Sequence, residues 1–258
     1  MHKILMPVFI FLSGHCFSQS LMDTAKVDSE AYFKKPKIEK RASVKSFILP
    51  AVLITYGATT LGHNALHTLN VSTKNELVED HPNFHTKVDN YLQYSPALAV
   101  YALNAFGVKG KNNFRDRTAI YALSTLISAA IVLPLKSITK EQRPDLSGYN
   151  SFPSGHTTTA FAAACFLQHE YKDVSPWYGI AGYAAATATG VLRMYNDRHW
   201  LGDVVAGAGF GILSTKLAYL IYPAIKKKIF KDKVSKTVCL PYIQSKGAGL
   251  ALLYTFTK

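Results

Sequence analysis

Apolar residues gather in six stretches of helical length, and polar or charged residues separate these stretches. The stretches cover residues 46–62, 91–108, 118–135, 156–171, 177–195 and 201–225. They are rich in Ala, Gly, Thr and Tyr rather than in Leu and Ile, so each is a weak membrane span. The pattern predicts an all-α protein, a helical bundle of about six helices that is embedded in a membrane. Burial of the same helices in a compact bundle outside the membrane is the alternative.

The segments outside the apolar stretches divide the chain further. Residues 1–18 combine Lys3, a short apolar run and a small, polar end, which is the order of a secretory signal peptide. An uncleaved anchor is the alternative, because Cys16 and Ser18 form a mediocre cleavage site. The remaining segments are a basic arm at residues 19–45, a helical domain at 46–225, and a basic tail with a short hairpin at 226–258.

The chain is basic, with 29 Lys and Arg against 16 Asp and Glu and a net charge of +13. Such an excess favours anionic partners, namely lipid headgroups, phosphorylated substrates or nucleic acid. If six helices cross a bilayer, the arm, the basic loop 109–117 and the tail fall on one side, which the positive-inside rule assigns to the cytoplasm. Cleavage of a signal peptide conflicts with this topology, because it would leave the arm outside.

The three cysteines do not predict a disulfide framework, and the paired histidines do not predict a metal site. Each histidine pair has the four-residue step that zinc sites use, but it lacks a third ligand. The residues concerned are Cys16, Cys165, Cys239, His63, His67, His81 and His85. We expect Cys165 to be buried as an apolar side chain and no metal to be bound.

His199 and Asp203 are four positions apart, so on a helix they share one face. A carboxylate in that position can hold the Nδ1 proton of the imidazole. Nε2 then keeps a free, basic lone pair, which a histidine nucleophile requires. An ordinary surface pair with the same spacing is the alternative.

The run Pro153-Ser154-Gly155-His156 opens the fourth apolar stretch and predicts an anion site. Ser154 is a strong N-cap candidate, and Gly155 lets a ligand approach the backbone. The N–H groups and the dipole of a helix N-terminus favour phosphate, and His156 in the first turn would lie beside it as a proton donor. A plain capped helix start is the alternative.

Three cations stand near these histidines in the predicted layout, at Lys136, Arg143 and Arg193. Guanidinium groups bind phosphate oxygens two at a time, and a lysine adds a compact charge. Snorkelling at helix ends explains one or two such residues, but not three beside two histidines.

Together, the clusters resemble the tripartite signature of the type 2 phosphatidic acid phosphatase family, which includes lipid phosphate phosphatases, bacterial class A acid phosphatases and vanadium haloperoxidases. The family pattern is Lys, six residues, Arg-Pro; then Pro-Ser-Gly-His; then Ser-Arg, five residues, His, three residues, Asp. The chain matches at Lys136, Arg143, Pro144, Pro153 through His156, Arg193, His199 and Asp203. Leu192 stands in place of the family serine, which removes a hydroxyl that could contact phosphate.

The resemblance implies that His199 attacks phosphorus, that Asp203 orients it, and that His156 protonates the leaving oxygen before it activates water. The phosphate-binding groups that it implies are Lys136, Arg143, Ser154, Gly155 and Arg193. No metal or other cofactor is then required, and the active site lies at one end of the bundle.

The predicted function is a metal-independent phosphatase for phosphomonoesters or pyrophosphates of a lipid such as lipid A, undecaprenyl pyrophosphate or phosphatidate. The expected partners are that lipid and the membrane, without nucleic acid. The expected location is the cell envelope, in the inner membrane with the site facing the periplasm, or else in the periplasm or at the outer membrane. A soluble broad-specificity acid phosphatase, a vanadium-dependent haloperoxidase and a noncatalytic membrane protein are the alternatives.

Overall fold

The computed structural model describes residues 8–9, 44–62, 64–229, 237–244 and 247–254. The chain divides into two units, one from Lys40 to Ile225 and one from Met1–Glu39 together with Lys226–Lys258. Of the predicted signal peptide, the structure describes only Val8 and Phe9. Of the predicted basic arm, it describes only residues 44–45.

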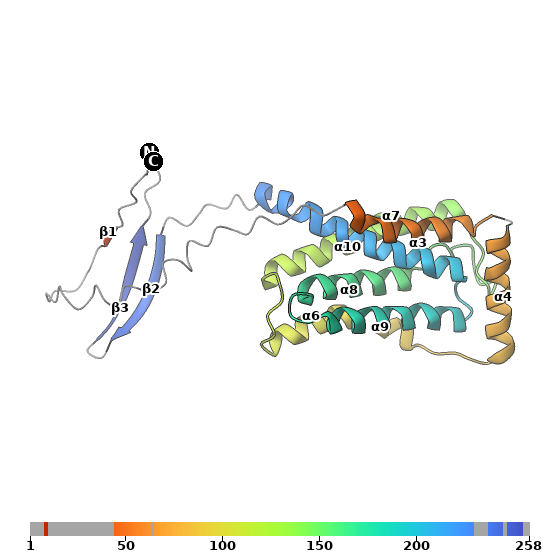
Figure 1. The fold of residues 1–258 in the computed structure, drawn as a ribbon, viewed down its shortest axis with the longest axis horizontal. Coiled ribbons are helices and arrows are strands. Elements are labelled where there is room, and N and C mark those ends of the chain that lie inside the picture. Colours follow the sequence, from red (N-terminus) through yellow and green to blue (C-terminus); the bar gives the residue numbers. More distant parts are fainter. Residues whose placement is uncertain (1–7, 10–43, 63, 230–236, 245–246, 255–258) are drawn as a thin grey trace. The chain divides into compact units, whose positions relative to one another are not determined.

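The larger unit is helical, which confirms the predicted all-α bundle (Figure 1). Its described α-helices are α3 (Ile48–Thr59), α4 (Ala65–Asp80), α5 (Val88–Leu92), α6 (Ser95–Ala105), α7 (Phe114–Thr139), α8 (Gly155–Tyr171), α9 (Pro176–Tyr195) and α10 (Leu201–Ile229), and a 3₁₀ turn at Val44–Phe47 precedes them. Each of the six predicted stretches overlaps one of these helices, namely α3 and α6 to α10, and α7 to α10 extend beyond the predicted bounds. Two helices, α4 and α5, were not predicted.

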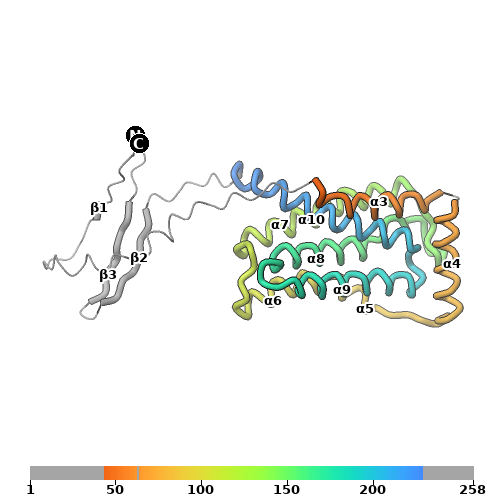
Figure 2. Tube along the Cα trace, viewed as in Figure 1, coloured from red at the N-terminus to blue at the C-terminus, as the bar shows by residue number. Residues whose placement is uncertain are grey.

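Helix α4 runs across the ends of the other helices rather than along them (Figures 1 and 2). Its sequence mixes charged and apolar residues without a stripe of helical period, so hydrophobic periodicity does not reveal it. The Asn64 side chain caps it by accepting hydrogen bonds from the amides of Leu66 and His67. Asn70 is buried and accepts a hydrogen bond from the amide of Gly202, at 2.9 Å. This bond attaches α4 to the first turn of α10.

The contact between α8 and α10 is unusually close because α10 carries small residues there. A Cβ atom added to Gly207 would lie 2.7 Å from the Ser154 carbonyl oxygen, and one added to Gly211 would lie 2.3 Å from that of Thr158. No ordinary side chain is tolerated at such distances, so glycine lets the two backbones meet. The start of α8 is thereby held against the first half of α10.

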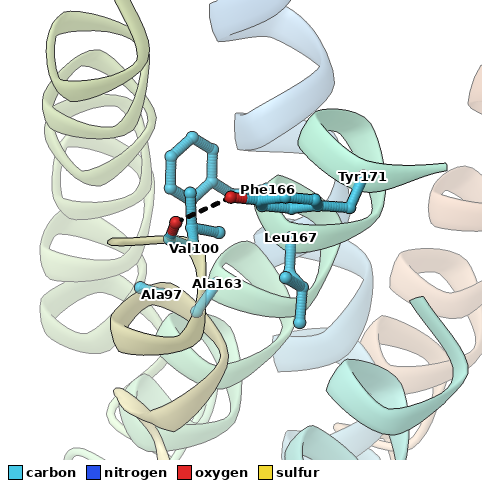
Figure 3. Close-up of a cluster of buried hydrophobic side chains, with 6 residues drawn as sticks. All are labelled: Ala97, Val100, Ala163, Phe166, Leu167 and Tyr171. Atoms are coloured by element: carbon cyan, nitrogen blue, oxygen red, sulfur yellow. Dashed lines mark hydrogen bonds between the residues drawn. The ribbon is translucent and has the colours of Figure 1, made fainter. Parts of the chain in front are cut away.

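A second packing contact fixes the other part of α8 against α6 (Figure 3). Its buried members are Ala97, Val100, Ala163, Phe166, Leu167 and Tyr171. The Tyr171 hydroxyl donates to the Val100 carbonyl oxygen at 3.0 Å, which satisfies a polar group inside this apolar cluster. Helix α8 therefore packs against α10 near its start and against α6 farther along, and these contacts fix the position of its N-terminus.

Two of the described helices, α7 and α10, are long and apolar enough to cross a membrane. Little of the apolar stretch of α7 is buried, and Leu126 and Leu133 are 67% and 64% exposed, whereas most of the apolar stretch of α10 is buried. An outward apolar face of this kind is unfavourable in water and favourable in lipid.

The smaller unit contains three described strands in the order β1-β3-β2. Strand β2 (Thr237–Gln244) pairs antiparallel with β3 (Gly247–Tyr254), and β1 (Val8–Phe9) pairs with the far end of β3. The pairing of β2 with β3 flanks residues 245–246, within the tail segment for which the sequence predicts a hairpin.

Candidate active site

The sequence-predicted site residues meet at one end of the helical unit. They come from the last turns of α7 and α9, the first turns of α8 and α10, and the loops between these helices. Lys136 lies within electrostatic range of Arg143, Arg193 and Asp203, and His199 lies within range of Lys136 and Arg193. The fold therefore places Lys136 and Arg193 near one buried imidazole, with Arg143 near Lys136.

His199 and Asp203 are both buried, at 3% and 2% exposure, and His199 Nδ1 lies 3.4 Å from Asp203 Oδ2. The two residues do not share a helix, because α10 begins at Leu201, after His199. Instead, Asp203 Oδ2 also accepts a hydrogen bond from the Trp200 amide at 3.0 Å, so the carboxylate closes the turn that leads into α10. The expected pairing is present, on a capped turn rather than on a helix face.

Burial lowers the pKa of His199 from 6.5 to about 4, and the hydrogen bond to Asp203 opposes this effect only in part. The imidazole is therefore neutral at pH 7. Since Asp203 lies on the Nδ1 side, Nε2 is the nitrogen that carries the free lone pair. This is the protonation state that a nucleophile needs.

Ser151 is a site residue that the sequence did not indicate. Its buried hydroxyl donates to Asp203 Oδ2 at 2.5 Å and lies 3.4 Å from His199 Nδ1. Its place depends on the loop before α8 folding back over the start of α10, and no local pattern encodes that path.

Ser154 caps α8 as predicted, because its hydroxyl accepts a hydrogen bond from the Thr157 amide. Its own amide donates to the Asp203 carbonyl oxygen at 3.0 Å, so the start of α8 is joined directly to α10. A Cβ added to Gly155 would meet nothing within 4 Å. The backbone at Gly155 is thus open to an approaching anion.

Lys136 and Arg143 both contact Asn150 in the loop before α8. Lys136 Nζ donates to the carbonyl oxygens of Asn150 and Ser151, at 2.6 and 3.3 Å, and Arg143 Nε donates to Asn150 Oδ1 at 2.8 Å. The loop thereby holds two cations at the site and leaves other donors of each available.

Arg193 has a partner that sequence reasoning missed. Its Nη1 lies 2.7 Å from Asp89 Oδ2 in α5, and both side chains are almost fully buried. The Nε of Arg193 is buried without a hydrogen-bond partner. An unpaired buried donor is costly, and a bound anion would satisfy it.

His156 also has a partner in α5. Its Nε2 lies 2.8 Å from Oδ1 of Asn90, the residue next to Asp89. An amide oxygen only accepts, so Nε2 carries the proton and donates it to Asn90. Asp89 and Asn90 stand in a short polar run without a motif, so no pattern in the sequence marked them.

Part of the helical unit is similar to known proteins. Residues 117–227 match the sequence profile of the PAP2 superfamily. A lipid A 1-phosphatase of Porphyromonas gingivalis is 42% identical over 151 residues, which are 58% of this chain and 33% of that protein. The chain spans about a third of the length of the curated relatives it matches.

Two solved structures are similar to the chain at 20% identity. The match to LpxE of Aquifex aeolicus includes 56% of this chain and 93% of that chain, with a TM-score of 0.43. The second structure is a transmembrane PAP2-type phosphatidylglycerolphosphate phosphatase of Bacillus subtilis. The match includes 70% of this chain and 97% of that chain, with a TM-score of 0.48.

Every sequence-predicted site residue lies inside the PAP2 segment, whereas Asp89 and Asn90 precede it. Leu192, which replaces the family serine, lines an apolar hollow of ≈ 370 Å³ on the outer part of α9. The other residues that line this hollow are His81, Phe84, Ala188, Val191 and Tyr195. Position 192 of the PAP2 segment therefore contributes an apolar wall rather than a hydroxyl.

The histidine pairs outside the PAP2 motifs have other neighbours. The ring of His81 packs against Tyr195 at 5.4 Å between centroids, and His67 Nδ1 lies 3.3 Å from the Thr60 carbonyl oxygen. His63 lies outside the described residues. Among the described residues, no three His, Cys, Asp or Glu side chains are grouped closely enough to hold a metal ion.

Proposed function

We propose that this chain is a phosphatase for a phosphorylated membrane lipid and that it works through a phosphohistidine on His199. One observation carries the proposal: a neutral, buried imidazole held by Asp203 lies near Lys136 and Arg193, with Arg143 near Lys136, and the backbone at Gly155 of α8 is open. A neutral nucleophile surrounded by cations suits the attack on an anionic phosphoryl group.

In the first step, the Nε2 lone pair of His199 attacks phosphorus. The bond between phosphorus and the leaving oxygen breaks, and that oxygen takes a proton from the doubly protonated, cationic form of His156, which becomes neutral. Asp203 holds the Nδ1 proton and stabilises the positive charge that develops on the ring of His199. The product alcohol departs and leaves a phosphohistidine.

In the second step, a water molecule gives a proton to His156 and attacks phosphorus. The bond between phosphorus and Nε2 breaks, inorganic phosphate departs, and His199 returns to its neutral form. The charge on the transferring group is balanced by donors from protein side chains and backbone alone, so the proposed reaction needs no metal. These donors are Lys136, Arg143, Arg193, Ser154 and Gly155.

We propose lipid A as the substrate, with removal of its 1-phosphate. The support is the 42% identity over 151 residues to a protein named lipid A 1-phosphatase, together with the PAP2 match at residues 117–227. The exposed apolar face of α7 fits an enzyme that meets its substrate in a bilayer.

We also propose that the catalytic end faces the periplasm. The basic loop 109–117 leads into the start of α7, and Lys136 stands near the end of the same helix. If α7 crosses the membrane, the positive-inside rule assigns the basic loop to the cytoplasm and the catalytic end to the opposite side.

The test is phosphate release by the purified full chain in detergent, with EDTA present. Lipid A, undecaprenyl pyrophosphate, phosphatidate and p-nitrophenyl phosphate form the panel, and release is expected to be fastest from lipid A. Cleavage of the soluble ester alone would support a broad acid phosphatase instead. Peroxide-dependent bromination after addition of vanadate, without phosphate release, would support a haloperoxidase.

A further inference from the structure

The segment from Thr86 to Asn90, which the PAP2 match does not include, reaches the site at three successive points. Thr86 and Asn196 exchange two hydrogen bonds, of 2.9 and 3.0 Å, through the Asn196 side chain and the Thr86 backbone. Asp89 then pairs with Arg193, and Asn90 with His156. Two adjacent side chains therefore hold two different groups of the proposed active site.

We propose that Asp89 and Asn90 are positioning residues, Asp89 for the phosphate-binding guanidinium of Arg193 and Asn90 for the proton-transfer imidazole of His156. The proposal deepens the phosphatase function and rests on it. Neither residue is expected to touch the substrate, because the contacts that define them are with Arg193 and His156 themselves.

The contact with Asn90 selects the atom through which His156 acts. Because Nε2 keeps its proton in the bond to Asn90 Oδ1, Nδ1 is the ring nitrogen that gives a proton to the leaving oxygen from the protonated ring and takes one from water in the neutral ring. Without the acceptor, the neutral ring would divide between two tautomers and lose its fixed orientation. A misplaced proton donor slows the chemical step while leaving phosphate binding intact.

The contact with Asp89 orients the guanidinium of Arg193. Oδ2 of Asp89 accepts a hydrogen bond from Nη1 of Arg193, and Nε of Arg193 is buried without a hydrogen-bond partner. A planar guanidinium that is held on one edge presents its remaining donors in a fixed direction. An anion bound there would satisfy Nε.

The kinetic test of Asn90 uses two substitutions and one control. Asn90→Leu keeps the size but removes the acceptor, and we expect kcat to fall about 10-fold to 100-fold with KM changed less than about twofold. Asn75→Leu, at an exposed position of α4, is the matched control and is expected to leave both constants unchanged. An unchanged kcat for folded Asn90→Leu would overturn the proposal.

Asn90→Asp serves as the second variant, because it keeps an acceptor oxygen and adds a charge. The charged groups around His156 are Arg193, Asp89, Arg143 and Lys136, and a new carboxylate favours the protonated ring against the three cations. The limb of the pH–rate profile that reports His156 is expected to move to higher pH, and kcat should recover most of the loss seen in Asn90→Leu. A profile identical to that of the parent protein would contradict the proposal.

A readout independent of turnover separates this proposal from the phosphatase proposal. Two-bond ¹H–¹⁵N spectra of histidine-labelled protein, with His156 assigned by His156→Gln, report which ring nitrogen carries the proton. The Nε2-protonated form is expected in the parent chain and is expected to be lost in Asn90→Leu. An Nδ1-protonated ring in the parent chain would overturn the role of Asn90 even if phosphate release is normal. Normal spectra without phosphate release from any ester would overturn the phosphatase proposal alone.

For Asp89, the substitution is Asp89→Asn, with Asp80→Asn at the exposed end of α4 as the control. Loss of the ion pair should lower kcat/KM about 10²-fold, mainly through KM, since Arg193 acts on bound phosphate. Inhibition by inorganic phosphate should weaken in parallel, whereas the control should match the parent protein. Unchanged phosphate inhibition in folded Asp89→Asn would overturn its role.

Discussion

The hydroxyl of Ser151 donates to Oδ2 of Asp203 across 2.5 Å, inside the protein and 3.4 Å from the imidazole of His199. One short bond thus joins the loop that precedes α8 to the carboxylate that holds the proposed nucleophile. Together with the bond from the Ser154 amide to the Asp203 carbonyl oxygen, it makes Asp203 the common anchor of both proposed catalytic histidines.

Ser151→Ala is expected to lower both activity and stability. Removal of the donor leaves a buried carboxylate with one partner fewer, which costs about 1–3 kcal/mol in the free energy of unfolding. The looser carboxylate should reduce kcat about tenfold, which is the effect of about 1.4 kcal/mol on the barrier. Chemical denaturation and steady-state kinetics measure the two effects. Ser147→Ala, in the same loop and outside these contacts with Asp203, should match the parent protein in kcat.

Replacement of the two proposed catalytic histidines should have different consequences. His199→Ala should reduce phosphate release to the uncatalysed level, because the nucleophile is lost. His156→Ala should lower kcat by about 10² to 10⁴, the usual contribution of a proton donor. With a ³²P-labelled substrate, His156→Ala should accumulate label on the protein if water attack becomes the slower step, and His199→Ala should carry none. Phosphate release unchanged in both variants would refute the catalytic assignment.

The acid limb of the pH profile for kcat/KM should lie near pH 4 rather than near 6.5, because burial depresses the pKa of His199 to about 4. The folded protein then binds this proton more weakly than the unfolded chain. The stability contributed by neutral His199 is therefore present above pH 6.5 and is lost as the pH falls from 6.5 toward 4. Asp203→Asn removes the group that favours the protonated ring, so it should move the limb lower still. A limb near pH 6.5 in the parent protein would contradict the burial argument.

Two glycines near Ser154 should respond differently to the same substitution. Gly207→Ala would place a Cβ 2.7 Å from the Ser154 carbonyl oxygen, so α8 and α10 must separate, at a cost of about 1–3 kcal/mol in the free energy of unfolding. Gly155→Ala meets no protein atom within 4 Å and should leave stability almost unchanged. Its methyl group would enter the space proposed for phosphate, so KM should rise. Thermal unfolding in detergent and steady-state kinetics distinguish the two effects.

The exposed apolar face of α7 should be required for membrane association. Leu126→Lys places a charge on that face, at a cost of about 2.5–3.5 kcal/mol if the position lies in the centre of the bilayer. Less protein is then expected in salt-washed membranes. Leu69→Lys, on the polar helix α4, is the matched control and should remain in the membrane fraction. Release of the parent protein by salt alone would contradict the proposal of an integral membrane enzyme.

The six apolar helices could be predicted because each apolar stretch has the length of a helix and is bounded by polar or charged residues. The cap at Ser154 followed from local chemistry as well, since the hydroxyl bonds to an amide three residues away. Helix α4 could not be predicted in this way, because its position depends on Asn70 and on the end of the bundle that it covers.

The sequence by itself determined the helices of the bundle, the proposed nucleophile, the proton donor and the cations, because these depend on residue types at short spacings. Only the tertiary structure decided what holds them. Asp89 and Arg193 are 104 positions apart in the sequence. Asn90 and His156 are 66 positions apart, and Ser151 and Asp203 are 52 positions apart. Pairings over such separations depend on how the helices pack and on the path of the connecting loops, as where the glycines of α10 let α8 lie close to it.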